Sequence, residues 1–153
     1  STAVIVDGIL RLFSSNPKRD ANIMRKDEAN PRSELLTGPK DRSPLRDIYI
    51  EGNDALLYKM VLNYLKACDD IFWSHAKEES FILRTIGVQA VLDVLRKLAG
   101  QSYADRDISV AYFAAKLDAA REIDFSNDRF RNPSGSGRTL IRRTIEEQIG
   151  LAA

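Results

Sequence analysis

The sequence is poor in the side chains that most often bind metals or form disulfides. Its 153 residues include one cysteine, Cys68, and one histidine, His75. A single cysteine excludes an internal disulfide, and Cys68 falls on the apolar side of a predicted helix, as expected for a small core residue in a reducing compartment. His75 follows Ser74 in a predicted turn, and a catalytic set around it would need a spatial convergence that the sequence does not indicate. We therefore assign no catalytic residue.

Metal ligation would have to rest on carboxylates, because one histidine and one cysteine are too few for a zinc site. Adjacent acidic pairs occur at 69–70 and 78–79. Neighbouring residues on a helix point in different directions, so neither pair forms a ligand cluster. We expect no metal and no cofactor.

The chain also lacks a net charge and long apolar runs. It has 23 basic and 22 acidic side chains, a formal net charge of +1. Such a balance creates no global field toward nucleic acid or lipid, so any such binding must be local. No apolar run approaches the roughly 20 residues that cross a bilayer. We expect a cytoplasmic protein with no membrane partner.

The first residues, STAVIVDG, do not form a signal peptide, because they have no basic region and no long apolar stretch. A helical pattern of apolar residues begins almost at the first residue. This favours a C-terminal fragment of a longer protein.

Helical periodicity is the main feature that the sequence does have. Apolar residues cover more than half of a 3.6-residue wheel in the stretch Phe81 to Leu98, which is typical of a central helix. On this wheel Arg84 falls between Val91 and Leu95, so we expect a buried guanidinium that needs a carboxylate or carbonyl partner. Three roles stay open for it: a structural tie, an interface contact or a ligand clamp.

A second long apolar helix is predicted from Asn53, its N-cap, to Trp73. The short link 74–80 predicts a central antiparallel pair, and Ala99-Gly100 is expected to end the second helix. We predict one all-α domain over residues 1–153, a single-domain helical bundle. Its core is expected to include Leu57, Met60, Tyr64, Leu83, Val88, Leu92 and Leu95.

Further helices are predicted around this pair, at 2–13, 17–25, 110–122 and 138–149, the last of them ending at Gly150. The segments 26–52 and 123–137 are loop-rich, with one helical turn at 33–36 and a short extended piece at 48–50. Asp107 or Ser109 is expected to cap the helix from 110. Three apolar residues should hold the second loop-rich segment to the core: Ile123, Phe125 and Phe130.

The most suggestive local feature is the glycine-rich loop Asn132 to Thr139, which leads directly into the last helix. Glycine-rich backbone at a helix N-terminus attracts phosphate or carboxylate. Of the P-loop pattern G-x-x-x-x-G-K-[ST], however, only Gly137 and Thr139 match, and Arg138 replaces the lysine. The sequence excludes an ATPase P-loop.

Two alternatives remain for this loop: a flexible hinge before a capped helix, or an anion or nucleic-acid phosphate site. The second is made by Gly135, Ser136, Gly137, Arg138, Thr139 and Arg142. Arg138 and Arg142 lie four residues apart on one helix face, so their guanidinium groups can converge on one phosphate. Arg129, Arg131 and Arg143 make the region locally basic. The alternative is a solvated helix face that Glu146 and Glu147 balance.

Several phrases together carry a family resemblance: IVDGILRLF, KRD at 18–20, RDIYIEGNDALLYKMVLNYLKACDDIFW, SFILRTIGVQAVLDVLRKL, IDFSNDRF and SGSGRTLIRRTI. With them the chain resembles the C-terminal helical region of bacterial DGQHR-domain proteins, a group similar to the DndB regulator of DNA phosphorothioation. The Asp-Gly-Gln-His-Arg motif itself is absent, because Asp7-Gly8 is followed by Ile-Leu-Arg. The resemblance therefore implies an accessory region and transfers no active-site residue.

We expect a non-enzymatic accessory or interaction domain of a DGQHR-type protein. The resemblance implies a link to DNA modification or defence, and the basic residues predict weak binding of nucleic acid. Expected partners are DNA, the upstream domain of the same protein, or another protein. The alternative is part of an enzyme that acts on a nucleotide or nucleic acid and whose catalytic residues lie mostly upstream. A buried polar cluster around Arg84 and His75 would favour that enzyme.

Overall fold

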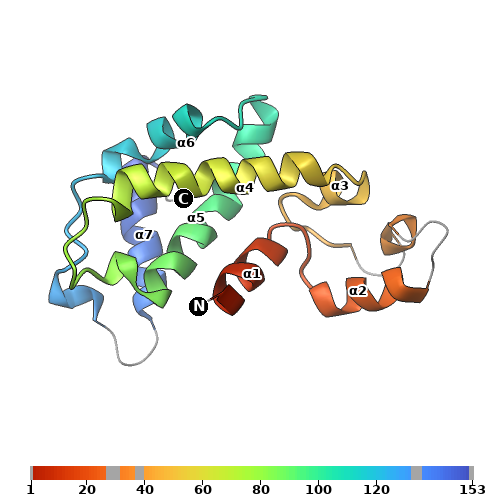
Figure 1. The fold of residues 1–153 in the computed structure, drawn as a ribbon, viewed down its shortest axis with the longest axis horizontal. Coiled ribbons are helices and arrows are strands. Elements are labelled where there is room, and N and C mark those ends of the chain that lie inside the picture. Colours follow the sequence, from red (N-terminus) through yellow and green to blue (C-terminus); the bar gives the residue numbers. More distant parts are fainter. Residues whose placement is uncertain (1, 27–31, 37–39, 132–135, 152–153) are drawn as a thin grey trace.

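A computed structural model describes residues 2–26, 32–36, 40–131 and 136–151 of the chain (Figure 1). This part of the chain is all-α, as the periodicity predicts, and contains no strand. Its α-helices are α1 (Thr2–Leu10), α2 (Pro17–Lys26), α3 (Arg46–Ile50), α4 (Asp54–Cys68), α5 (Thr85–Ala104), α6 (Val110–Leu117) and α7 (Gly137–Ile149). Short helical turns join or extend them: η1 (Ser33–Leu36), η2 (Asp69–Trp73), η3 (Phe81–Leu83), η4 (Asp118–Ala120) and η5 (Asp128–Phe130).

Helix α4 runs along the long axis of the molecule, with α6 and the crossing α5 packed against it and with α7 and α1 packed against α5 (Figure 1). The largest contact of α4 is with α6, whereas α5 packs mainly on α7 and also on α1. Helices α4 and α5 meet at a crossing, where the buried Tyr64 hydroxyl donates to the Val91 carbonyl oxygen at 2.5 Å. The two helices thus contact each other, but α4 packs more extensively on α6, and α5 packs more extensively on α7.

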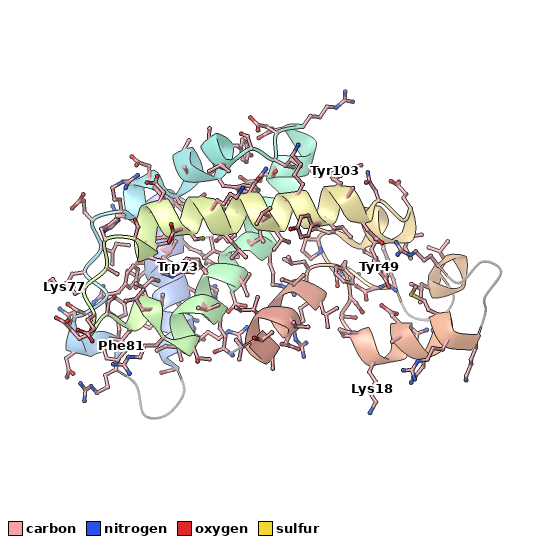
Figure 2. The ribbon with its side chains drawn as sticks, in the orientation of Figure 1. Lys18, Tyr49, Trp73, Lys77, Phe81 and Tyr103 are labelled. Atoms are coloured by element: carbon pink, nitrogen blue, oxygen red, sulfur yellow. The ribbon has the colours of Figure 1, made fainter. Side chains whose placement is uncertain are left out.

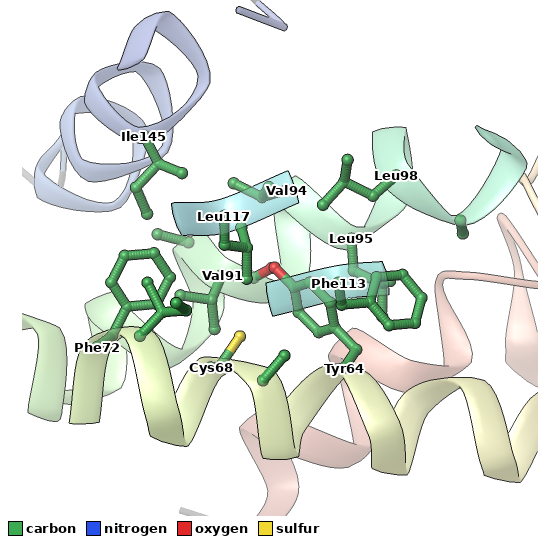
Figure 3. Close-up of a cluster of buried hydrophobic side chains, with 14 of the residues drawn as sticks. Tyr64, Cys68, Phe72, Val91, Val94, Leu95, Leu98, Phe113, Leu117 and Ile145 are labelled. Carbon is green, nitrogen blue, oxygen red and sulfur yellow. The ribbon is translucent and has the colours of Figure 1, made fainter. Parts of the chain in front are cut away.

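The core lies between α4, α5, α6 and α7 (Figure 3). It includes the predicted Leu57, Met60, Tyr64, Leu92 and Leu95, all buried, and Cys68 is buried as expected. Val88 is only half-buried. Burial raises the pKa of the Cys68 thiol and holds it in its neutral form, so it behaves as a small apolar core residue.

The start of the second long helix differs from the prediction. Residues 81–83 form the separate turn η3, Arg84 is extended (φ −91°, ψ 172°), and α5 begins at Thr85. The turn folds back on the first turn of α5, where a Cβ at Gly87 would overlap the backbone of Ile82. This break takes residues 81–84 off the wheel of α5. Leu83 is therefore 43% exposed and not in the core, and Arg84 is exposed and not buried.

Two other boundaries were predicted wrongly. Gly100 does not end α5, which continues to Ala104. Residues 48–50 are not extended but belong to α3, because helical backbone there places Ile48 in the core, where it is 2% exposed. No helix among the described residues is long and apolar enough to cross a membrane.

Local chemistry set three helix boundaries as the sequence predicts, whereas the helices predicted over 2–13 and 110–122 end earlier, at Leu10 and Leu117. The Asn53 side chain accepts from the Leu56 N–H at 3.2 Å, and Ser109 accepts from the Tyr112 N–H at 3.0 Å. Helix α7 ends at Gly150, whose φ of 79° is left-handed. The turn at 33–36 is present as η1, and the predicted helix 53–73 is α4 followed without a break by η2. Phe125 and Phe130 are buried and Ile123 is half-buried.

Candidate functional site

The predicted anion site does not have two free guanidinium groups. Arg138 forms a bidentate pair with Asp93 of α5, with Nε to Oδ2 at 2.6 Å and Nη2 to Oδ1 at 2.7 Å. These hydrogen bonds raise the pKa of the Arg138 guanidinium, which stays charged. Arg138 thus ties the start of α7 to α5.

Arg142 is engaged in the same way by a carboxylate. Its Nη1 donates to both oxygens of Glu146, at 3.0 and 2.9 Å, and Lys97 of α5 donates to Glu146 Oε2 at 2.8 Å. Glu146 is only 2% exposed, so it is not part of the solvated face that the alternative reading predicted. Two cations neutralise this buried carboxylate, and releasing Arg142 to a phosphate would weaken that compensation.

The other predicted members of this site do not form a cradle in the described part of the chain. Gly137 is buried and Thr139 is half-buried, and the Ser136 side chain makes no capping hydrogen bond at the start of α7. Gly135 lies outside the described residues. The geometry therefore supports a tie from α7 to α5 at Arg138 and an ion pair within α7 at Arg142, and not a phosphate site.

Arg84 and His75 do not form a buried polar cluster, because both side chains are exposed. The His75 Nε2 lies 2.8 Å from the Ile71 carbonyl oxygen one turn earlier. Arg84 lies with its guanidinium carbon 6.0 Å from the centre of the Phe81 ring. Among the described residues, no three histidine, cysteine or acidic side chains gather as a metal site would require.

An apolar cleft lies between α1 and α4 and is called the α1–α4 cleft below. Its volume is about 420 Å³. The α4 side is lined by Leu57, Tyr58, Val61, Leu62 and Leu65. The opposite side is lined by Ile9 of α1 and by Leu12 and Phe13, which follow α1. Tyr58 is 71% exposed although it continues the apolar stripe of α4. A cleft of this size and composition is typical of binding sites.

One end of the α1–α4 cleft is polar. Arg32 forms a bidentate pair with Asp54, both N–O distances being 2.9 Å, and also donates to the Tyr49 carbonyl oxygen at 2.9 Å. The hydrogen bond with Arg32 lowers the pKa of Asp54, so the pair stays ionised at neutral pH. Tyr49 closes this end, stacked on Phe13 with 4.4 Å between ring centres. Its position is seen in Figure 2.

A buried ionic cluster behind this end holds α3 in place. Arg46 of α3 pairs with Asp20 of α2 at 2.5 Å and donates to the Phe13 carbonyl oxygen at 3.0 Å. The Ser14 hydroxyl donates to the same Asp20 carboxylate, and the Asp41 carboxylate lies 3.7 Å from Arg46. Sequence reasoning missed this cluster, because Asp20 falls in a helix with a polar pattern and its partner is far along the chain.

One signal for the α1–α4 cleft was present in the sequence. Six of the nine residues of α1, TAVIVDGIL, are apolar, and they occur on nearly every side of the helix. The periodicity alone did not show that α1 would lie at the surface. In the structure no residue of α1 is buried, and Val6 is 47% exposed.

Comparisons with known proteins found no relative of this chain. No protein-family model, no curated protein and no solved structure matches the chain. The resemblance to the C-terminal region of DGQHR-domain proteins therefore stays a prediction, and the function has to be argued from the structure itself.

Proposed function

We propose that this chain is a non-enzymatic interaction domain and that its α1–α4 cleft receives an amphipathic helix of a partner protein. The exposure of α1 carries the proposal. A helix that is apolar on nearly every side is normally buried, yet α1 has no buried residue. Covering apolar surface contributes about 25 cal/mol for each Å² removed from water, so a partner on this face gains stability from it.

The shape of the apolar surface favours a helix as the occupant. Along α4 it extends from Tyr58 to Leu65, about two helical turns, and on the other side it includes Ile9 of α1. The exposed Val6 stands three residues before Ile9, on the same side of α1. An amphipathic helix presents apolar side chains in such a line, at i, i+3 or i+4, and i+7. The Arg32–Asp54 pair at the end, with the Asp54 side chain 64% exposed, offers a polar contact to a charged residue of the partner.

The DGQHR resemblance would extend this proposal in one direction. The partner would be the upstream domain of the same protein or another protein, with the link to DNA modification or defence coming from the parent protein. The enzyme alternative called for a buried polar cluster around Arg84 and His75. The exposure of both side chains supports an interaction domain over an enzyme.

Site-specific photo-crosslinking tests the proposal. A benzophenone amino acid is placed at Tyr58, in the cleft, and as matched control at Lys59, the next exposed residue of α4. In cells that produce the protein, we expect a crosslink from position 58 and not from 59 to a segment with an amphipathic helical stripe. A synthetic peptide of that segment should then bind the purified domain.

Substitutions in the cleft decide whether the binding is specific. Val6→Asp and Leu62→Asp place charge in the apolar line and should weaken peptide binding at least tenfold, whereas Lys59→Asp should leave it unchanged. A crosslinked segment without helical periodicity, or peptide binding insensitive to both cleft variants, would contradict the proposal. Crosslinks to a second copy of the chain would make the occupant this domain itself and would also contradict it.

A further inference from the structure

A second cleft lies at the opposite end of the molecule from α2 and has an aromatic ring in its wall. It is called the Phe81 cleft and is lined by Glu79, Phe81, Arg84, Ser126 and Arg131, with a volume of about 390 Å³. Figure 2 labels Phe81 at this end and Lys18 of α2 at the other. The α1–α4 cleft shares none of these residues, so the inference does not depend on the proposed function.

The Phe81 ring is held on a fixed platform. The Phe81 N–H donates to the Phe125 carbonyl oxygen at 2.9 Å, and the Trp73 indole N–H donates to the Ile82 carbonyl oxygen at 3.0 Å. Ser80, itself buried, caps the turn η3 by accepting from the Ile82 N–H. The turn therefore cannot swing away without losing these bonds, while the ring stays half-buried and open on the cleft side.

Two arginines from separate segments approach this ring. The guanidinium carbons of Arg84 and Arg131 each lie 6.0 Å from the ring centre. Such contacts are weak at exposed sites, about 0.5–1 kcal/mol. Arg84 has no carboxylate partner among the described residues, and Arg131 pairs only with Asp128, where the two side chains are 72% and 85% exposed. Exposed pairs of this kind contribute little, so both guanidinium groups are available to a ligand.

An aromatic ring with two guanidinium groups weakly held over it matches the repeating chemistry of a nucleic-acid strand. Bases stack on aromatic side chains with about 1–3 kcal/mol per base, and arginines bind the phosphates. Stacking of this kind needs an unpaired base, because a duplex hides the base faces in its own stack. A single strand therefore fits the Phe81 cleft better than a duplex.

Acidic residues reduce the positive charge of this site. Glu79 lines the cleft and Asp128 pairs with Arg131, while Lys77 and Asp124 nearby pair with each other at 3.7 Å. The charges at the cleft are thus balanced, two arginines against Glu79 and Asp128, in keeping with the net charge of only +1 for the chain. Binding is expected to be weak and to decline with salt.

We propose that the Phe81 cleft binds single-stranded nucleic acid, with one base stacked on Phe81 and a neighbouring phosphate held by Arg84 and Arg131. This places nucleic-acid contact at a different point from the glycine-rich loop, where the arginines are paired with Asp93 and Glu146. Because Trp73, the one tryptophan of the chain, is bonded to η3, its fluorescence reports on the site.

The test is a titration of the domain with oligothymidylate, oligouridylate and a DNA duplex of equal length, at low and moderate salt. Trp73 fluorescence and anisotropy of a labelled strand are followed together. We expect both single strands to bind more tightly than the duplex, with affinity falling as salt rises. Absence of binding at low salt, or tighter binding of the duplex, overturns the proposal.

Variants assign the binding to the cleft. Arg84→Gln/Arg131→Gln should weaken it at least tenfold and Phe81→Leu severalfold, while Arg25→Gln, an exposed arginine of α2, leaves it unchanged. Glu79→Gln removes from the cleft a negative charge that repels phosphate and should strengthen binding severalfold. Misfolding does not produce such a gain. Binding untouched by the double variant contradicts the site. Equal displacement of the strand by polyglutamate at matched charge would show a general anion site instead.

Discussion

The buried charges in the described part of the chain each meet an opposite charge. Asp20 and Arg46, 3% and 8% exposed, pair with one another, and the buried Glu146 receives Arg142 and Lys97. An uncompensated charge in such places costs several kcal/mol, which pairing with good hydrogen bonds offsets. An arginine that looks like a phosphate ligand in the sequence can for this reason be the structural partner of a buried carboxylate, and Arg142 is an example.

Asp41 gives the residue-scale prediction, a dependence of stability on pH. Burial by itself raises the pKa of Asp41, but hydrogen bonds from Ser43 and Ser15 outweigh it and hold this pKa below its ordinary value of 3.8. The folded state then binds the proton more weakly than the unfolded chain. The stabilisation is complete above the unfolded pKa and is lost as pH falls through the lower, folded pKa.

Urea unfolding between about pH 6 and pH 2 measures this effect. The free energy of unfolding should fall on acidification below about pH 4, and Asp41→Asn should be less stable at pH 6 and less sensitive to acid. Asp47→Asn, at an exposed carboxylate of α3, is the control and should keep the full acid response. An unchanged slope in Asp41→Asn would show that other carboxylates carry the acid response.

At the scale of elements, the start of α5 is fixed by the close approach of η3 to Gly87. A Cβ there would overlap backbone atoms of Ile82, which cannot move aside as the end of a side chain can. Gly100, in the same helix, has nothing within 4 Å of its added Cβ. At Gly87 the close backbone of Ile82 leaves no room for a side chain, whereas at Gly100 the packing does not require glycine.

The pair supports a matched prediction. Gly87→Ala should destabilise the fold by about 1–3 kcal/mol or more, because it over-packs backbone against backbone. Gly100→Ala should stabilise it by about 0.5–1 kcal/mol, since alanine is the better helix former. Thermal unfolding followed by circular dichroism compares the two. Equal effects of both substitutions would mean that η3 does not rest on α5 as described.

Helix ends fixed by local chemistry could be predicted from the sequence, and those fixed by packing could not. Asn53 and Ser109 cap their helices through bonds to residues three positions on, and Gly150 ends α7 through its left-handed backbone. The residue type alone was therefore sufficient to predict these ends. Arg84 was predicted to be buried because one continuous helix was assumed for 81–98, whereas the helix is broken at 81–84. Residues 48–50 were read as extended from their β-branched and aromatic side chains, a preference that burial of Ile48 overrides.

The candidate sites were harder to predict than the helices, because they depend on distant pairs. Arg138 and Asp93 are 45 residues apart, and Lys97 and Glu146 are 49 apart. Nothing local in the sequence marks these carboxylates as partners, so the arginines were read as free for phosphate. The Phe81 cleft likewise needs residues 81–84 beside 126–131, a proximity that follows only from the fold.

At the scale of the whole molecule, α2 is attached differently from the bundle helices. The bundle buries apolar side chains, whereas the one buried residue of α2 is the charged Asp20. Figure 1 shows α2 at the far end, next to η1 and away from α6 and α7. A segment with few buried apolar contacts opens at a lower free energy than the core, so α2 should open without the bundle.

Hydrogen exchange of backbone amides tests this division. Asp20→Asn removes the closer of the two carboxylates beside the buried Arg46 guanidinium and leaves only Asp41, at 3.7 Å. Breaking a fully buried pair costs about 3–5 kcal/mol, and the remaining Asp41 reduces that cost here. Exchange in α2 and α3 should accelerate at least tenfold, which is about 1.4 kcal/mol, while exchange in α5 and α7 changes little. Asp93→Asn is the control from the other end and should accelerate α7 but not α2, because it removes the partner of Arg138. Equal acceleration of α2 and α5 in Asp20→Asn would show that the molecule opens as one cooperative unit and that the ionic cluster belongs to its common core.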